Sequence, residues 1–96
     1  MMLRSSSNVF ADLGFSPLEA ENLKVRADLM IAIQQLIAAR QLTQANAAKL
    51  LGVTQPRISD LVRGKINLFS IDVLVAMLGR AGVHVSVRVR PAVRVA

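Results

Sequence analysis

Hydrophobic residues recur every three or four positions along the first half of the chain, the spacing that places them on one face of a helix. Residues 17–40 form the longest such segment, which contains no glycine or proline after Pro17. Ser16 can act as its N-cap, with Pro17 in the first helical position and Glu19 completing a capping box. The pattern predicts one helix over 17–40, with a break near 24–28 as the alternative. Its apolar positions are Leu23, Val25, Ala27, Leu29, Met30, Ile33, Leu36 and Ile37.

Two shorter helical patterns come next, separated by a single glycine. Thr43 can cap the first, and Gly52 follows its last residue, where a chain reversal favours a residue that adopts positive φ. Thr54 can cap the second helix, Pro56 lies in its first turn, and Gly64 ends it. The shared apolar residues predict that the two helices pack steeply against each other: Ala47, Ala48, Leu51, Val53, Ile58 and Leu61. This is the arrangement of a helix-turn-helix that places its second helix in the DNA major groove.

The period of the pattern changes near the end of the chain. A further helix is expected over 70–82, with Ser70 as its N-cap and Gly82 at its end. Residues 83–90 then alternate apolar and polar through four cycles, which predicts a half-buried β-strand. A single strand cannot satisfy its own backbone groups, so we expect it to pair with a second copy of the chain. The alternative is an edge offered to a different protein. The predicted dimer residues are Val83, Val85, Val87 and Val89.

These elements divide the chain into three parts. Residues 1–15 are expected to form a partly disordered N-terminal arm, 16–82 the helix-turn-helix domain, and 83–96 a dimerisation strand and tail. The arm carries Phe10 and Phe15, which either staple it onto the core or form a docking strip for a partner protein. The predicted fold class is all-α, a bundle of about four helices with a C-terminal β-strand paired across a dimer.

Composition narrows the class of protein. The 96 residues are 53% hydrophobic but only 3% aromatic, which predicts a core of leucine, isoleucine, valine and alanine. The absence of cysteine excludes disulfides and thiolate metal sites. No apolar run is long enough to span a membrane, and no signal peptide is evident, so a cytoplasmic location is expected. His84 is the only histidine and has no accompanying ligand or nucleophile, so we expect no enzyme, metal or cofactor.

Charge is distributed unevenly between the two halves. The formal net charge is +6, but residues 1–39 hold three basic and four acidic side chains. Residues 40–96 hold nine basic and two acidic side chains, so the positive charge coincides with the helix-turn-helix and the segment after it. This distribution is typical of a protein that binds a phosphate backbone. A membrane-binding amphipathic helix is disfavoured, because the long helix lies in the acidic half.

The outward face of the second short helix carries the predicted base contacts. A helix that enters the groove by its N-terminal end presents its first two turns to base edges. Gln55 can pair with adenine, Arg57 can pair with guanine, and Pro56 can contact a thymine methyl group. Asp60 either accepts a hydrogen bond from a cytosine amine or orients a neighbouring arginine.

Other polar residues are placed to contact phosphate. Gln44 begins the first short helix, where backbone amides also face a phosphate. Arg63 and Lys65 come after the second helix and are predicted phosphate anchors. The full predicted DNA-binding set is Gln44, Thr54, Gln55, Pro56, Arg57, Ser59, Asp60, Arg63 and Lys65.

The motif resembles the helix-turn-helix of the Xre/Cro/C1 repressor family, which has a lambda-repressor-like fold. The matching residues are Leu42, Thr43, Gln44, Ala48, Leu51, Gly52, Val53, Thr54, Gln55, Ile58, Ser59, Arg63, Gly64 and Lys65. Residues 8–90 also resemble short regulators of the HigA antitoxin kind. The resemblance implies a dimer, an operator with two-fold symmetry and, often, an RNA-cleaving toxin partner of the RelE type. It also implies that Gln44 contacts phosphate and that Gln55, Arg57 and Ser59 face bases. The sequence departs from the common family pattern at Ala47, Pro56 and Asp60.

Two functional hypotheses agree with these features. The first is a repressor that binds a palindromic operator in double-stranded DNA as a homodimer. The alternative is an antitoxin that neutralises a RelE/HigB-type toxin by direct binding and regulates its own operon. The two roles are compatible in one chain.

Overall fold

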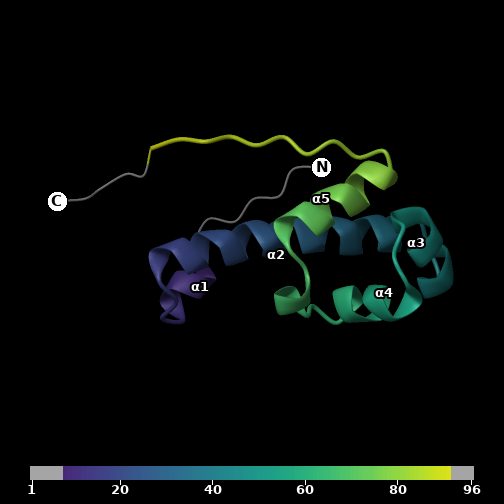
Figure 1. The fold of residues 1–96 in the computed structure, drawn as a ribbon, viewed down its shortest axis with the longest axis horizontal. Helices are drawn as coiled ribbons and strands as arrows, with labels where there is room; N and C mark the ends of the chain where they lie inside the picture. The colour runs from purple at the N-terminus through teal and green to yellow at the C-terminus, as the bar shows by residue number, and fades with distance from the viewer. Residues whose placement is uncertain (1–7, 92–96) are drawn as a thin grey trace.

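A computed structural model describes residues 8–91 of the chain. This part contains one short 3-10 helix, η1, and five α-helices, with no β-strand. Figure 1 shows α2 as the long axis of the molecule, with α3, α4 and α5 gathered along its C-terminal half. The elements in chain order are α1 (Val9–Asp12), α2 (Pro17–Ala39), α3 (Gln44–Leu51), α4 (Gln55–Val62), η1 (Ile66–Leu68) and α5 (Ile71–Arg80).

Helix α2 is continuous, so the helix predicted over 17–40 is confirmed and the alternative break is absent. It begins as its sequence indicates, because the Ser16 hydroxyl accepts a hydrogen bond from the Glu19 amide at 3.3 Å. Only part of its apolar face is covered by the rest of the chain. Val25, which the spacing assigns to that face, is exposed, because two residues of helix turn it away from the side on which Ala20 and Leu23 are buried. The buried residues of α2 are Ala20, Leu23, Met30, Ile33 and Leu36.

The core lies where the second half of α2 meets α3, α4 and α5. Its buried side chains are all apolar, and Phe69 is the one aromatic residue among them. The loop before α5 is therefore anchored by Phe69, as the sequence indicates. The core cluster consists of Met30, Ile33, Leu36, Ala47, Ala48, Leu51, Ile58, Leu61, Phe69, Leu74, Met77, Leu78 and Ala81.

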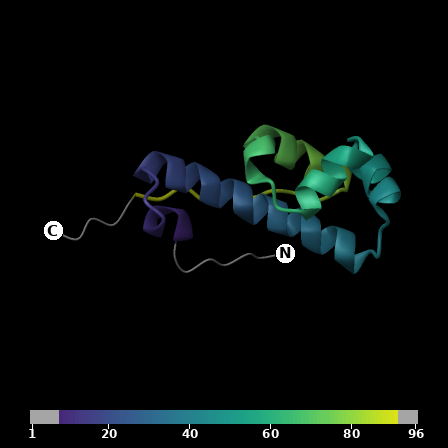
Figure 2. The same cartoon turned by 90° about the horizontal axis from the view of Figure 1, so that it is seen from below.

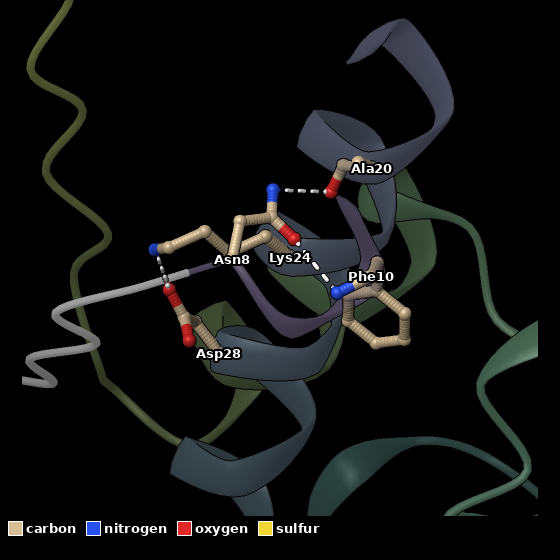
Figure 3. A network of polar contacts seen from close by, with 5 residues as sticks. All are labelled: Asn8, Phe10, Ala20, Lys24 and Asp28. Carbon is tan, nitrogen blue, oxygen red and sulfur yellow. Dashed lines mark hydrogen bonds and ion pairs between the residues drawn. The ribbon is translucent and has the colours of Figure 1, made fainter. Parts of the chain in front are cut away.

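The N-terminal region differs from the predicted arm. Residues 9–12 form α1, which packs beside the N-terminal half of α2, while residues 1–7 lie outside the described chain. Asn8 joins the two helices: its Nδ2 donates to the Ala20 carbonyl at 2.9 Å, and its Oδ1 accepts from the Phe10 amide at 3.1 Å (Figure 3). Because α1 is present, the described chain has five α-helices where the sequence predicts about four. Local spacing did not reveal it, because four residues are too few to establish a helical period.

The two phenylalanines of this region pair with each other. The ring centroids of Phe10 and Phe15 are 6.1 Å apart, and the rings meet edge to face. Neither residue belongs to the main core cluster. Nearby on α2, Lys24 and Asp28 form an ion pair at 3.0 Å (Figure 3). The phenylalanines thus belong to a small unit at one end of α2, separate from the helix-turn-helix core.

The C-terminal segment also differs from the prediction. Residues 83–91 run back along α2 as irregular chain and not as a strand (Figures 1 and 2). Val83 and Val85 are half-buried against the core, whereas Val87 is 80% and Val89 is 89% exposed. A strand needs a second strand to receive its backbone hydrogen bonds, and the described part of one chain supplies none. Of the alternating valines, only the first two are therefore partly buried.

Candidate nucleic-acid interface

Helices α3 and α4 form the helix-turn-helix that the sequence predicts. The Thr43 hydroxyl caps α3 by accepting a hydrogen bond from the Asn46 amide at 3.1 Å. Gly52 ends α3 with a φ of 71°, and its amide and that of Val53 both donate to the Ala48 carbonyl. The small Ala48 is buried at this point, together with Leu51 and Ile58. The turn is therefore tight, and the buried faces of α3 and α4 determine which residues point outward.

Thr54 occupies the N-cap position of α4, but its hydroxyl makes no capping hydrogen bond. The backbone has the extended geometry of a cap, with φ −76° and ψ 158°. The sequence predicts a side-chain cap here, so this expectation is corrected. Pro56 has no amide hydrogen to offer, and the Arg57 amide donates to the Thr54 carbonyl at 3.1 Å. The exposed Thr54 hydroxyl is consequently available to another hydrogen-bond acceptor or donor.

The predicted DNA-binding residues differ in how far they are exposed. Those at the start of α3, at the start of α4 and after α4 are exposed: Gln44, Thr54, Gln55, Pro56, Arg63 and Lys65. The remaining three, Arg57, Ser59 and Asp60, are half-buried. The exposed residues come from two helix N-termini and from the loop after α4. Such a surface presents backbone amides, polar side chains and cations together, which suits a polyanion.

Arg57 is held by residues of the loop after α4. Its Nη1 donates to the Leu68 carbonyl at 2.9 Å, and its Cζ lies 4.2 Å from the centroid of the Phe69 ring. This is a cation–π arrangement. The sequence places Arg57 on the outward face and Phe69 in the core, but it gives no sign that the two residues meet. Arg57 is thus pre-positioned in the structure, whereas the sequence pattern alone indicates only an outward-facing side chain.

Asp60 forms an ion pair with Lys65, with 3.5 Å between Oδ1 and Nζ. The Lys65 amide also donates to the Asp60 carbonyl at 3.0 Å. One of the two roles predicted for Asp60 from the sequence is to orient a neighbouring arginine, and the structure pairs it with a lysine. Because Gly64 has a φ of 74°, the chain turns sharply after α4 and brings Lys65 back to the helix. The predicted phosphate anchor Lys65 therefore lies next to a carboxylate.

Two side chains of α2 donate hydrogen bonds to backbone carbonyls of α4 and η1. Gln34 Nε2 donates to the Leu61 carbonyl at 2.9 Å, at the C-terminal end of α4. Arg26 Nη1 donates to the Ile66 carbonyl of η1 at 3.4 Å. Neither residue has a role that the sequence predicts. The only signal in the sequence is that each is a polar residue between apolar positions of a long helix.

Within residues 8–91, no group of three or more histidine, cysteine, aspartate or glutamate side chains is arranged to hold a metal ion. His84 is exposed. None of the helices in the described chain is long and apolar enough to cross a membrane. The polar and basic surface around α3 and α4 is therefore the clearest candidate site of the described chain.

Known proteins share this sequence pattern and this fold. A family model described as a helix-turn-helix domain matches residues 9–90. A solved structure named as an XRE-family transcriptional regulator has 32% sequence identity to the chain and a TM-score of 0.71. The similarity covers 81% of this chain and 90% of the other. No curated protein matches the sequence.

Proposed function

The chain belongs to the helix-turn-helix domain family and contains an Xre-type helix-turn-helix, and we propose that this regulator represses transcription by binding a palindromic operator as a homodimer. One observation carries the proposal. The first turn of α4 presents Thr54, Gln55 and Pro56 to solvent, and the Thr54 hydroxyl is not used as a cap. Polar side chains exposed at the start of a recognition helix are those that reach base edges in the major groove.

Phosphate contacts would come from both sides of this helix. Gln44 is exposed at the N-terminus of α3, and the first amides of a helix have no acceptor within the helix, which favours a phosphate there. Arg63 and Lys65 are exposed just after α4. Contacts of this kind position the protein on DNA, while Gln55, Arg57 and Ser59 would distinguish the bases.

The C-terminal segment supports the homodimer. Val87 and Val89 are 80% and 89% exposed, and their backbone has no strand partner in the described chain. Pairing with the same segment of a second copy around a two-fold axis would cover both valines and satisfy the backbone groups. A dimer of this kind would hold two recognition helices about 34 Å apart, one turn of DNA. The two-fold symmetry of such a dimer is the reason to expect a palindromic operator.

Selection of bound sequences from random duplex DNA tests the proposal. We expect enrichment of a site with two-fold symmetry, whose half-sites are separated by about one turn of DNA. Enrichment of a single unsymmetrical site would argue against the dimer. Binding without any sequence enrichment would argue against the operator itself.

The N-terminal end of α2 favours a second function, that of an antitoxin. Four apolar side chains are exposed there: Val9 (55%), Leu13 (69%), Phe15 (43%) and Leu18 (86%). A shallow groove of about 420 Å³ lies among Phe15, Leu18, Leu23 and Arg26. Exposed apolar clusters of this kind mark protein-binding surfaces. The resemblance to HigA-type antitoxins suggests a RelE/HigB-type toxin as the occupant, and the exposed Asp12, Glu19 and Glu21 nearby suit a basic partner.

Substitution of the most exposed apolar residue separates the two functions. Leu18→Asp should abolish binding of a toxin encoded beside this chain while leaving operator binding unchanged, because Leu18 is in the first turn of α2. That end of α2 lies away from α4 (Figure 1). Val75→Asp, at an exposed position of α5, is the control and should leave toxin binding intact. Equal effects of the two substitutions would contradict this use of the surface.

A further inference from the structure

The contact between Arg57 and Phe69 joins the recognition helix to the core. Phe69 is 1% exposed and belongs to the central hydrophobic cluster, so its ring is held in one place. The Arg57 guanidinium lies over that ring, with Cζ 4.2 Å from the centroid. At the same time Nη1 donates to the Leu68 carbonyl at 2.9 Å. Two different interactions therefore restrain one flexible side chain.

This restraint reduces the conformational entropy that Arg57 would lose on binding DNA. A free arginine side chain loses much rotational freedom when it docks on a base, and that loss opposes binding. An arginine already ordered in the free protein loses less. The Leu68 contact lies in an exposed setting, so the guanidinium is ordered at the surface and not withdrawn into the core.

The contacts leave one edge of the guanidinium for a ligand. Nη1 is occupied by the Leu68 carbonyl, whereas Nε and Nη2 have no hydrogen-bond acceptor within residues 8–91. Nε and Nη2 form one of the two-donor edges of an arginine, and two parallel donors match the O6 and N7 acceptors of guanine. Stacking on an aromatic ring keeps that edge planar and in a fixed orientation.

We propose that Phe69 is a specificity-determining residue, which acts through Arg57 by holding its Nε–Nη2 edge ready for a guanine. This inference rests on the proposed operator binding. Phe69 touches no DNA itself and is a positioning residue. A competing role for Arg57 is that of a clamp that only attaches the loop at residues 64–70 to α4, and it predicts that substitutions of Arg57 weaken all operators equally.

The experiment compares three variants on the selected operator and on operators changed at one base pair at a time. Arg57→Met keeps an unbranched side chain with an aliphatic stem but has no hydrogen-bond donors. Phe69→Leu keeps an apolar core residue but has no ring face. Ile33→Val is the matched control, because it loosens the same core from α2 but keeps both the Leu68 carbonyl and the Phe69 ring that hold Arg57. All measurements are made where circular dichroism shows each variant to be folded.

We expect Arg57→Met to lose about 5- to 150-fold of discrimination at one guanine position per half-site. Phe69→Leu should lose at least about fivefold at the same position, and the double variant should lose no more than Arg57→Met alone. Ile33→Val should retain the discrimination. The inference would be overturned if Arg57→Met weakened binding to all operators equally, or if Phe69→Leu kept full discrimination. Either result would leave the proposed operator binding in place.

A measurement without DNA tests the restraint separately. In the free protein, NMR should show the Arg57 Hδ resonances shifted upfield by the Phe69 ring, and Phe69→Leu should remove the shift. A normal Hδ shift in the unmodified protein would contradict the inference even if operator binding is found. Absence of any sequence-selective binding by the unmodified protein would instead contradict the proposed function.

Discussion

The side chain of Arg80, the last residue of α5, lies directly over Gly52 in the turn between α3 and α4. A Cβ atom placed on Gly52 would be 2.5 Å from both Cδ and Nε of Arg80. Gly52 also has a φ of 71°, in the left-handed region. The left-handed backbone therefore favours glycine at the centre of the helix-turn-helix, and the end of the exposed Arg80 side chain would have to move aside for a larger residue.

Substitution of Gly52 should show the cost of the left-handed backbone. We expect Gly52→Ala to lower the free energy of unfolding by about 1 kcal/mol through left-handed strain, because the exposed Arg80 side chain can move aside. Gly82→Ala is the control, because Gly82 has a φ of 77° but open space around it, and it should cost about 1 kcal/mol. Urea denaturation measures both. The two losses should be similar, and a loss for Gly52→Ala that is larger by more than about 1 kcal/mol and is recovered by adding Arg80→Ala would contradict a freely displaced Arg80.

Alanine substitutions of three N-cap residues should separate effects on stability from effects on DNA binding. Thr43 and Ser70 accept capping hydrogen bonds, so Thr43→Ala and Ser70→Ala should each cost about 1 kcal/mol of stability. Thr54 makes no such bond, so Thr54→Ala should cost only a few tenths of a kcal/mol. Its operator affinity should nevertheless fall about two- to tenfold if the free hydroxyl contacts DNA. A large stability loss in Thr54→Ala, measured by thermal unfolding, would contradict the structure.

The ion pair between Asp60 and Lys65 should weaken DNA binding. It is 3.5 Å long and partly exposed, so its contribution to stability is small. Asp60→Asn should change the free energy of unfolding by no more than about 0.5 kcal/mol. Because the substitution removes a negative charge beside a phosphate anchor, it should raise affinity for nonspecific DNA by roughly three- to tenfold. Fluorescence anisotropy with random-sequence duplexes measures this, and reduced nonspecific affinity would count against Lys65 as an anchor.

Arg63 and Gln55 should affect DNA binding in different ways. Arg63→Ala should weaken binding to every sequence and lower the slope of log affinity against log salt by about 0.9, the value for one lost phosphate contact. Gln55→Ala should leave the slope unchanged and cost about 1–3 kcal/mol only against operators with adenine at one position. Salt titrations on the operator and on single-base variants distinguish the two patterns. A sequence-dependent effect of Arg63→Ala would exclude a pure phosphate contact.

The exposed end of the C-terminal segment provides a test of dimerisation. Val87 and Val89 contribute little to the packing of one chain, so their joint replacement by serine should leave thermal stability of the monomer nearly unchanged. The same change should weaken the dimer at least about tenfold, because apolar area that pairing would bury is lost. Analytical ultracentrifugation measures the association. An unchanged dimer would mean that subunits meet through another surface.

Local sequence was sufficient to predict most of the helices and their ends. Caps at Ser16, Thr43 and Ser70 and the glycine at position 52 act within one turn of their own helix, so neighbouring residues contain the necessary information. The outward face of α4 was also predictable from local sequence. It lies opposite the buried residues Ile58 and Leu61, whose spacing is visible in the sequence. The DNA contacts assigned to that face remain predictions.

Longer-range features required the tertiary structure. Asn8 attaches α1 to α2 by donating to the Ala20 carbonyl, and the stacking of Arg57 on Phe69 joins residues on either side of a loop. The segment after Gly82 has the alternation of a strand, yet within residues 8–91 it has no second strand to pair with. Periodicity reports which side chains face a common surface, but it contains no information on which distant group lies opposite them. Partners, and therefore the position of Arg57 and the state of the C-terminal segment, depend on how the helices pack around α2.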